Sequence, residues 1–182
     1  MVEGRASKQT LIKIMTPIKV KVLLADDDPD DWQLMLEAFG ENGLAHELDC
    51  VENGEELMEY LHRRGRYSKL QKTSLPQLIL LDLNMPRKDG REALKEIEAD
   101  PVLRRIPVVA LTTSVAEEEI RRSYDLGANS YIIKPATFKS LVELVKTLCQ
   151  YWFKSVELPQ PTGVNTAREA IPAVDEKLAT TD

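Results

Sequence analysis

Three carboxylates in this sequence directly follow short apolar runs. Asp26 and Asp27 come after the apolar run Val20–Ala25, and Asp82 ends the run Leu78–Leu81. A carboxylate this close to an apolar core is costly unless a metal, a hydrogen-bond network or a chemical role compensates it. Taken alone, Asp82 fits equally well as the cap of the following turn.

Two further polar residues follow apolar runs later in the chain. Thr112 comes after the run at residues 106–111, and Lys134 comes after the run at residues 130–133. Singly, a threonine there often caps a turn and a lysine is often only solvated. An acidic pair, an aspartate, a threonine and a lysine, all at the ends of apolar runs, together favour one shared site.

Five apolar runs alternate with five segments of helical character, and this order sets the expected fold. The predicted strands are residues 20–25, 46–51, 78–81, 106–111 and 130–133, and the predicted helices are residues 29–39, 54–64, 90–99, 116–126 and 137–153. The pattern predicts one doubly wound α/β domain, a five-stranded parallel sheet flanked by five helices. The carboxyl ends of its strands share one rim, where such folds place their ligands.

Local signals place several helix ends. Asp28 before Pro29 is typical of an N-cap followed by proline at the first helical position. Asn53 is predicted to cap the second helix, with Glu56 at the capping-box position. In the first helix, Trp32, Leu34, Met35, Leu36 and Phe39 are expected to form the apolar face.

Composition shifts divide the chain into an N-terminal arm at residues 1–17, a folded domain at 18–154 and a proline-rich tail at 155–182. Arm and tail are predicted to be flexible or disordered. The segment at residues 65–76 is longer than usual between elements of such a domain, so we interpret it as a decorated surface loop or a partner-contact site.

Charge and composition exclude several classes of protein. A net charge of -6 and a pI near 5.1 argue against nucleic acid as a main partner. No apolar run approaches the roughly 20 residues of a membrane span, and no signal-peptide core is present, so we expect a cytoplasmic protein. The cysteines and histidines stand in no ligand pattern and are expected to be structural or on the surface: Cys50, Cys149, His46 and His62.

Three crowded carboxylates repel one another unless a cation lies among them. Oxygen ligands of this kind suit Mg²⁺, which is typically held by one or two carboxylates and shared with a phosphoryl group. An ionised aspartate beside such an ion can attack phosphorus and form an acyl phosphate. Lys134 would then offer a positive charge to one phosphoryl oxygen, and the Thr112 hydroxyl would donate to another.

With these residues the sequence resembles the receiver domains of two-component response regulators over about residues 19–153. The matching positions are Asp26 and Asp27 as the acidic pair, Asp82 as the phosphoacceptor, Thr112 as the switch hydroxyl, Lys134 before Pro135, and Tyr131 as the aromatic switch residue. The resemblance implies the flavodoxin-like receiver fold. It also implies that Asp27, Asp82 and the backbone carbonyl of Asn84 bind magnesium directly, with Asp26 acting through water, and that the Lys134–Pro135 bond is cis.

The strings LILLDLNMPRKDGRE, IPVVALTTS and RSYDLGANSYIIKP resemble more narrowly the cyanobacterial phytochrome response regulators. These stand-alone receivers accept phosphate from a light-sensing histidine kinase and often dimerise through the fourth and fifth helices and the fifth strand. The resemblance therefore implies a phytochrome kinase as partner, a downstream phosphotransfer protein and a homodimer. Tyr151, Trp152 and Phe153 are expected either to fold back on the core or to form the dimer seam, and we favour the seam.

In this family picture, phosphorylation of Asp82 draws Thr112 inward and lets Tyr131 rotate from solvent toward the interior. Asn84 and Ser114 line the path of water to the acyl phosphate and are predicted to tune its lifetime. Output is expected through protein contact, since no output domain follows residue 155, and the protein is not expected to be a dedicated enzyme.

Two other classes of function remain open. A phosphatase of the haloacid dehalogenase kind also uses aspartate and magnesium, but its nucleophile should follow the first strand, whereas Asp82 follows the third. A phosphorylation-independent binding module would keep the pocket as a relic. All the site residues are present, which counts against this second alternative.

Overall fold

The computed structural model describes residues 20–42 and 46–159 of the 182-residue chain. The predicted arm at residues 1–17 and most of the predicted tail lie outside this described part. The backbone of His46 is described, but its side chain is not. The strands are β1 (Val20–Ala25), β2 (His46–Val51), β3 (Leu78–Leu81), β4 (Val108–Thr112) and β5 (Ser130–Ile133), and the helices are α1 (Pro29–Glu41), α2 (Gly54–Leu61), α3 (Gly90–Ala99), α4 (Glu117–Asp125) and α5 (Phe138–Gln150).

All five strands pair in parallel in the order β2-β1-β3-β4-β5, which confirms the predicted doubly wound α/β fold. Every residue of β3 and β4 is buried, as expected for central strands covered on both faces. The strand order reverses between β1 and β3. Ligands of such sheets bind at the carboxyl ends of the strands beside this point.

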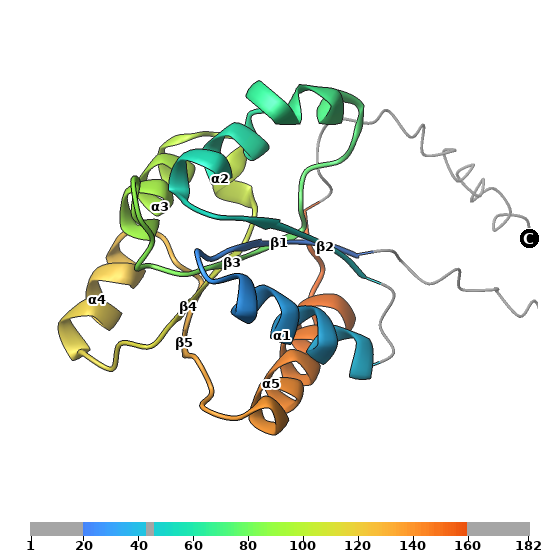
Figure 1. The fold of residues 1–182 in the computed structure, drawn as a ribbon. Coiled ribbons are helices and arrows are strands. Elements are labelled where there is room, and N and C mark those ends of the chain that lie inside the picture. Colours follow the sequence, from blue (N-terminus) through green and yellow to red (C-terminus); the bar gives the residue numbers. More distant parts are fainter. Residues whose placement is uncertain (1–19, 43–45, 160–182) are drawn as a thin grey trace, which may run out of the picture.

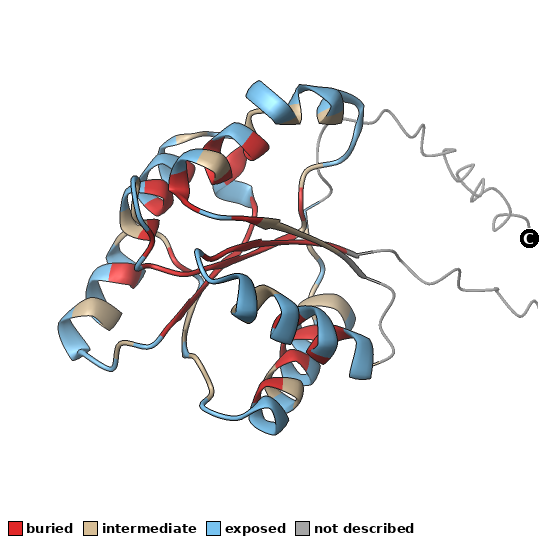
Figure 2. Ribbon diagram, viewed as in Figure 1, coloured by how far each residue is buried: buried red, intermediate tan, exposed pale blue. Residues whose placement is uncertain are grey.

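Helices cover both faces of the sheet (Figure 1). Helices α1 and α5 lie together on one face, over a core that includes Val22, Leu80 and Val145. Helices α2 and α3 lie on the other face, over Leu23, Leu81 and other buried residues, while α4 contacts the edge strand β5. Figure 2 shows the buried residues concentrated along the sheet and on the inner sides of the helices.

Side-chain caps fix where the helices begin. The Asp28 carboxylate accepts from the backbone N–H of Asp30, and Asn53 accepts from the N–H of Glu56, as the sequence predicts for both caps. Helix α3 starts with a full capping box between Asp89 and Glu92. The caps set the direction in which each chain segment leaves the rim of the sheet.

Close packing of the chain around Gly90 holds the end of β3 in place. A Cβ atom at Gly90 would lie 2.2 Å from the backbone oxygen of Asp82 and 2.7 Å from the Cα of Leu83. These are backbone atoms that cannot move without displacing the strand end, so only glycine fits here. The start of α3 thus packs directly against the residue that carries the Asp82 carboxylate.

Several expected details differ in the structure. Leu34 and Leu36 are exposed rather than part of the α1 core face, which consists of the buried Met35, Ala38 and Phe39 with the partly buried Trp32. Helix α2 ends at Leu61 instead of residue 64, because Arg63 and Gly65 have positive φ angles. The loop that follows contains a short 3₁₀ helix, Gly65–Lys72, with Tyr67 and Leu70 packed on the core.

The end of the last helix also differs from the expectation of one helix over residues 137–153. Helix α5 ends at Gln150 and continues as a π-helical turn over Tyr151–Ser155. The wider turn packs Trp152 and Phe153 against the α1–α5 core, while Tyr151 stays exposed. None of the helices in residues 20–42 and 46–159 has the length and apolar character needed to cross a lipid bilayer.

Candidate functional site

The carboxyl ends of β1 and β3 bring three aspartates together. One carboxylate oxygen from each of Asp26, Asp27 and Asp82 lies within 4.8 Å of the others. Backbone hydrogen bonds fix two of them, because the N–H of Asp26 donates to Val51 O and that of Asp82 donates to Ala25 O. Asp26 and Asp82 are buried, whereas Asp27 is exposed to solvent.

Lys134 provides the positive charge in this cluster. Its Nζ lies 2.7 Å from an oxygen of Asp26, of Asp82 and of Asp31. The lysine reaches them because its backbone N–H donates to Thr112 O, which extends the β4–β5 pairing past the end of β5. Asp31 on α1 was not identified from the sequence, where it reads as an ordinary acidic residue in the first turn of a helix.

The expectation of a cis Lys134–Pro135 bond is wrong for this structure, because no peptide bond in the described residues is cis. The trans isomer is the intrinsically favoured one for a bond before proline.

Burial dominates the electrostatics of the rim. Desolvation raises the pKa of Asp26 to about 6, and its ion pair with Lys134 offsets only part of that effect. Burial alone would lower the pKa of Lys134, but hydrogen bonds to Asp26, Asp31 and Asp82 together raise it. One ammonium group therefore serves three carboxylates, and the exposed Asp27 adds a fourth negative charge nearby.

This donor set fits a divalent cation. Hard carboxylate oxygens from Asp26, Asp27 and Asp82 lie within 4.8 Å of one another, and their excess negative charge is the kind that Mg²⁺ or Mn²⁺ neutralises. Asp27 is the most accessible of the three, so a cation can reach the cluster from solvent.

Thr112 and Asn84 form the other side of the rim. The Thr112 hydroxyl oxygen is fully buried and accepts hydrogen bonds from Asn84 Nδ2 at 3.2 Å and from the Ser114 N–H at 3.4 Å. The backbone N–H of Asn84 donates to Asp82 Oδ1 at 2.9 Å. The end of β4 is thereby joined to the end of β3 through side chains as well as through the sheet.

Tyr131 lies nearer the interior than expected. Its ring is half-buried against the α2–α3 core, and its hydroxyl donates to the backbone oxygen of Ser114 at 3.0 Å. The sequence-based expectation placed this ring in solvent before any signal. In the structure, the phenol already bonds the loop between β4 and α4.

A small cavity opens beside Lys134, between α1 and the start of α5. Its volume is about 90 Å³, and its walls combine Asp26, Asp31 and Lys134 with apolar side chains that include Leu34, Phe138 and Leu141. The charged wall belongs to the cluster of aspartates, so the cavity gives access to the rim from the α1–α5 side.

Comparison with known proteins identifies the family. A family model described as the response regulator receiver domain matches residues 22–146. The chain belongs to the response regulator receiver family. The matched range includes β1 from Val22 onward, all of β2, β3, β4 and β5, and all of the rim residues described above.

Relatives of this receiver include phytochrome-linked proteins. The chain is 41% identical over 143 residues to the response regulator Rcp1 of Synechocystis, covering 79% of this chain and 95% of that protein. It is similar to the crystal structure of the phosphorylated cyanobacterial phytochrome response regulator RcpA, at 44% identity and a TM-score of 0.72, covering 78% of this chain and 99% of the other.

A second solved structure bears on the metal. The Mn²⁺-bound form of Rcp1 matches with a TM-score of 0.69 at 40% identity, covering 77% of this chain and 99% of that one. A relative of this receiver therefore binds a divalent cation, in agreement with the acidic cluster of Asp26, Asp27 and Asp82. The receiver is thus a two-component signalling protein related to phytochrome response regulators.

Proposed function

We propose that this protein is a single-domain response regulator that accepts a phosphoryl group on Asp82 from a partner histidine kinase, which we infer to be a phytochrome. The observation that carries the proposal is the setting of the Asp82 carboxylate. It is buried at the strand rim, next to two other aspartates and 2.7 Å from the Lys134 ammonium. Such a carboxylate can attack phosphorus as a nucleophile, and its phosphorylation changes the charge at the rim.

In the transfer, an oxygen of Asp82 forms a bond to phosphorus while the bond from phosphorus to the donor's imidazole nitrogen breaks. That nitrogen takes up a proton from water. Lys134 exchanges part of its contact with Asp26 and Asp82 for a phosphoryl oxygen, and the backbone N–H of Asn84 keeps the carboxyl group in place. Positioning and charge neutralisation account for the catalysis, so the protein assists its own phosphorylation without being a dedicated enzyme.

Magnesium held by Asp26, Asp27, Asp82 and the backbone carbonyl of Asn84 would supply positive charge to the transferred group. Asp26 is the most buried of these acids, and we assign it a contact through water. The raised pKa of Asp26 supports a requirement for a cation, because the ionised form is unfavourable at this position without one.

The signal passes through Thr112 and Tyr131. A phosphoryl group adds about -1.5 to -2 charge at Asp82 and attracts the Thr112 hydroxyl. Movement of Thr112 toward that group draws its oxygen away from the Asn84 and Ser114 donors, and Ser114 is the residue that the Tyr131 hydroxyl contacts. Movement of this loop changes the face formed by α4 and β5.

That face supports a role in protein contact. Val115, Tyr124 and Ile133 are large apolar residues exposed there, at 71%, 50% and 49% of their surface. We propose that it serves a homodimer formed through α4, β5 and α5, and a downstream phosphotransfer protein. Trp152 and Phe153 contact the core, so of the three terminal aromatics only Tyr151 is offered to the dimer seam. A protein mass in solution that stays monomeric at every concentration would refute the dimer.

The proposal is tested by the intact mass of the protein after incubation with acetyl phosphate and Mg²⁺. We expect a gain of about 80 Da for one phosphoryl group in the wild type and no gain in Asp82→Ala. Asp31→Asn is the matched control, because it also removes a carboxylate from Lys134 but leaves the acceptor. Absence of an adduct at every Mg²⁺ concentration would favour the phosphorylation-independent binding module instead.

A further inference from the structure

Arg91, in the first turn of α3, contacts the two residues that follow the phosphoacceptor Asp82. Its guanidinium donates to the side-chain oxygen of Asn84 at 3.3 Å and to the backbone oxygen of Leu83 at 3.3 Å. Only 14% of the Arg91 side chain is exposed. Both acceptors belong to the two residues that follow Asp82, so Arg91 holds the side chain of Asn84 in one orientation.

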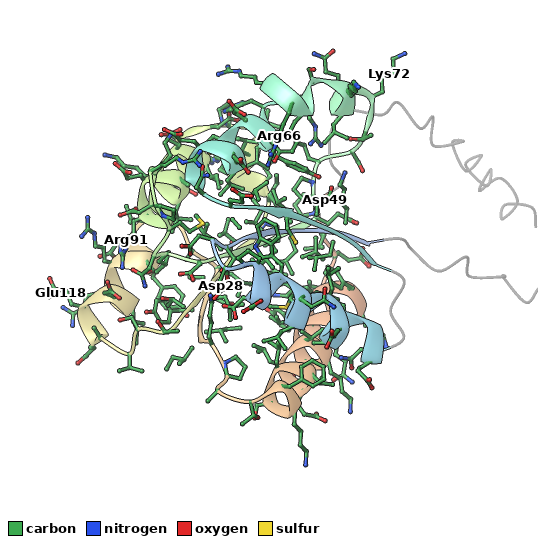
Figure 3. All side chains as sticks on the ribbon, viewed as in Figure 1. Asp28, Asp49, Arg66, Lys72, Arg91 and Glu118 are labelled. Carbon is green, nitrogen blue, oxygen red and sulfur yellow. The ribbon has the colours of Figure 1, made fainter. Side chains whose placement is uncertain are left out.

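The same guanidinium also joins α3 to α4. It donates to the carboxylate of Glu119, which lies in the first turn of α4, and Figure 3 shows Arg91 on the side of α3 that faces α4. Hydrogen bonding to Ser114 and the charge of Arg91 lower the pKa of Glu119, so the carboxylate is ionised at neutral pH. Arg91 therefore connects Asn84, in the loop after β3, to Glu119 on α4, which forms part of the proposed output face.

Asn84 completes the connection to Thr112. With its oxygen held by Arg91, the Asn84 amide turns its Nδ2 toward Thr112, which accepts at 3.2 Å. The Thr112 oxygen thereby accepts from Asn84 as well as from the backbone N–H of Ser114. A displacement of the Thr112 oxygen toward a phosphoryl group would lengthen the bond from Asn84, and that bond depends on the orientation that Arg91 imposes.

We propose that Arg91 is a positioning residue that, through Asn84, holds Thr112 and α4 in the resting arrangement and so opposes phosphoryl-dependent switching. The contacts of Arg91 with Asn84 and Glu119, together with the bond from Asn84 to Thr112, form what we call the Arg91 latch. An interaction made only in the resting state lowers the affinity for any ligand that requires the other state. The inference rests on the proposed function, because the latch acts on the switch at Asp82.

The test uses beryllium fluoride with Mg²⁺ as a stable mimic of the phosphoryl group, bound by the full chain. Fluorescence of Trp32 reports binding, because its Nε1 donates to the backbone oxygen of Asp26 at 2.8 Å. We expect Arg91→Gln and Asn84→Ala each to bind the mimic about 3- to 10-fold more tightly than the wild type. Glu119→Gln should shift affinity in the same direction by about 2-fold, since it keeps a hydrogen bond but loses the charge.

A double-variant measurement separates positioning from a general structural effect. If Arg91 acts on Thr112 through Asn84, adding Arg91→Gln to Asn84→Ala should change the affinity further by no more than the about 2-fold expected for losing the contact with Glu119. Arg121→Gln is the matched control on α4, because Arg121 pairs with Glu117 on the exposed side of that helix, 3.7 Å apart. It should bind the mimic as the wild type does.

Unchanged or weaker binding by Arg91→Gln would overturn the latch, and so would a double variant in which the full effects of the two substitutions add. Should Arg91→Gln unfold, Glu119→Gln and Asn84→Ala decide the question by the same criteria. A wild type that gains no phosphoryl mass and binds no mimic would instead refute the proposed function. Normal phosphorylation with no change in the variants would refute the latch alone.

Discussion

Charged side chains cluster at both ends of β1, and the two clusters differ in how well positive and negative charges are matched. Near the amino end, Lys21 is 8% exposed and lies 3.3 Å from an oxygen of Asp49 on β2. At the carboxyl end, Asp26 is 1% exposed and shares Lys134 with two other aspartates. Figure 3 labels Asp49 on β2 and Asp28 beside the start of α1, which mark the two regions.

In the amino-end cluster, Lys21 and Asp49 form a matched ion pair. The hydroxyl of the buried Tyr60 donates to Asp49, and the Arg63 guanidinium lies 4.8 Å from the centre of the Tyr60 ring. Burial raises the pKa of Tyr60, so its phenol stays a donor. Arg63 also donates to the backbone oxygen of Ser74, which ties the 65–76 loop to the domain. The one carboxylate of this cluster is matched by Lys21, the Arg63 guanidinium is satisfied by backbone oxygens and the Tyr60 ring, and the cluster stabilises the fold.

The carboxyl-end cluster lacks this balance, and the difference indicates what each cluster does. Asp26, Asp31 and Asp82 compete for one ammonium, and Asp27 adds another negative charge. Such an excess costs stability unless a cation or a proton compensates it. A cluster with excess negative charge on an open rim is suited to binding a metal ion and to accepting a phosphoryl group. A cluster with paired charges is suited to stabilising the fold.

Lys134→Gln should have the largest effect on stability. Removing the ammonium leaves the buried carboxylates of Asp26 and Asp82 without a cation, and we expect a loss of about 3 kcal/mol in the free energy of unfolding at neutral pH without Mg²⁺. Urea unfolding measures it. Added Mg²⁺ should restore part of the loss, and the control Lys88→Gln, at a more exposed pair with Glu96, should change stability by less than about 0.5 kcal/mol.

The pH dependence of stability should reveal the cost of ionising Asp26. The pKa of Asp26 is raised from 3.8 to about 6 in the folded protein, so the folded state binds this proton more tightly than the unfolded state. Its contribution is fully present below pH 4 and is lost as pH rises through about 6, a change on the order of 3 kcal/mol.

The measurement compares unfolding of the wild type and Asp26→Asn between pH 4 and pH 7.5 in buffer without Mg²⁺. We expect the variant to lack the part of the slope that Asp26 supplies. Saturating Mg²⁺ should flatten the wild-type curve, because a bound cation favours the ionised carboxylate. Equal slopes in the two proteins would contradict this account.

Tyr60→Phe should have the smallest of these effects and should change stability without changing activity. It removes the hydroxyl that donates to Asp49, and we expect a loss of about 1 kcal/mol because water can replace the donor at this partly exposed carboxylate. The phosphoryl mass gain with acetyl phosphate should be unchanged. A loss of phosphorylation would mean that the amino-end cluster supports the site as well as the fold.

The sequence predicted most of the fold because each central strand is a short apolar run and most helix starts carry a recognisable cap. It predicted the shared rim because parallel strands must end on the same side. The exposed Leu34 and Leu36 were wrongly placed in the core, since periodicity alone cannot show how far α5 covers α1. Asp31 was missed because its role depends on the reach of Lys134, which is 103 residues away.

By itself, the sequence determined which residues could do chemistry and that they meet, because side-chain types and the ends of apolar runs can be read locally and parallel strands end on one rim. Only the tertiary structure decided which of these residues form ion pairs and hydrogen bonds with one another. Lys134 serves three carboxylates, Tyr131 already contacts Ser114, and Arg91 joins the phosphoacceptor loop to α4. These contacts join residues from different elements, so they depend on how the helices pack against the sheet and on the low exposure that this packing creates.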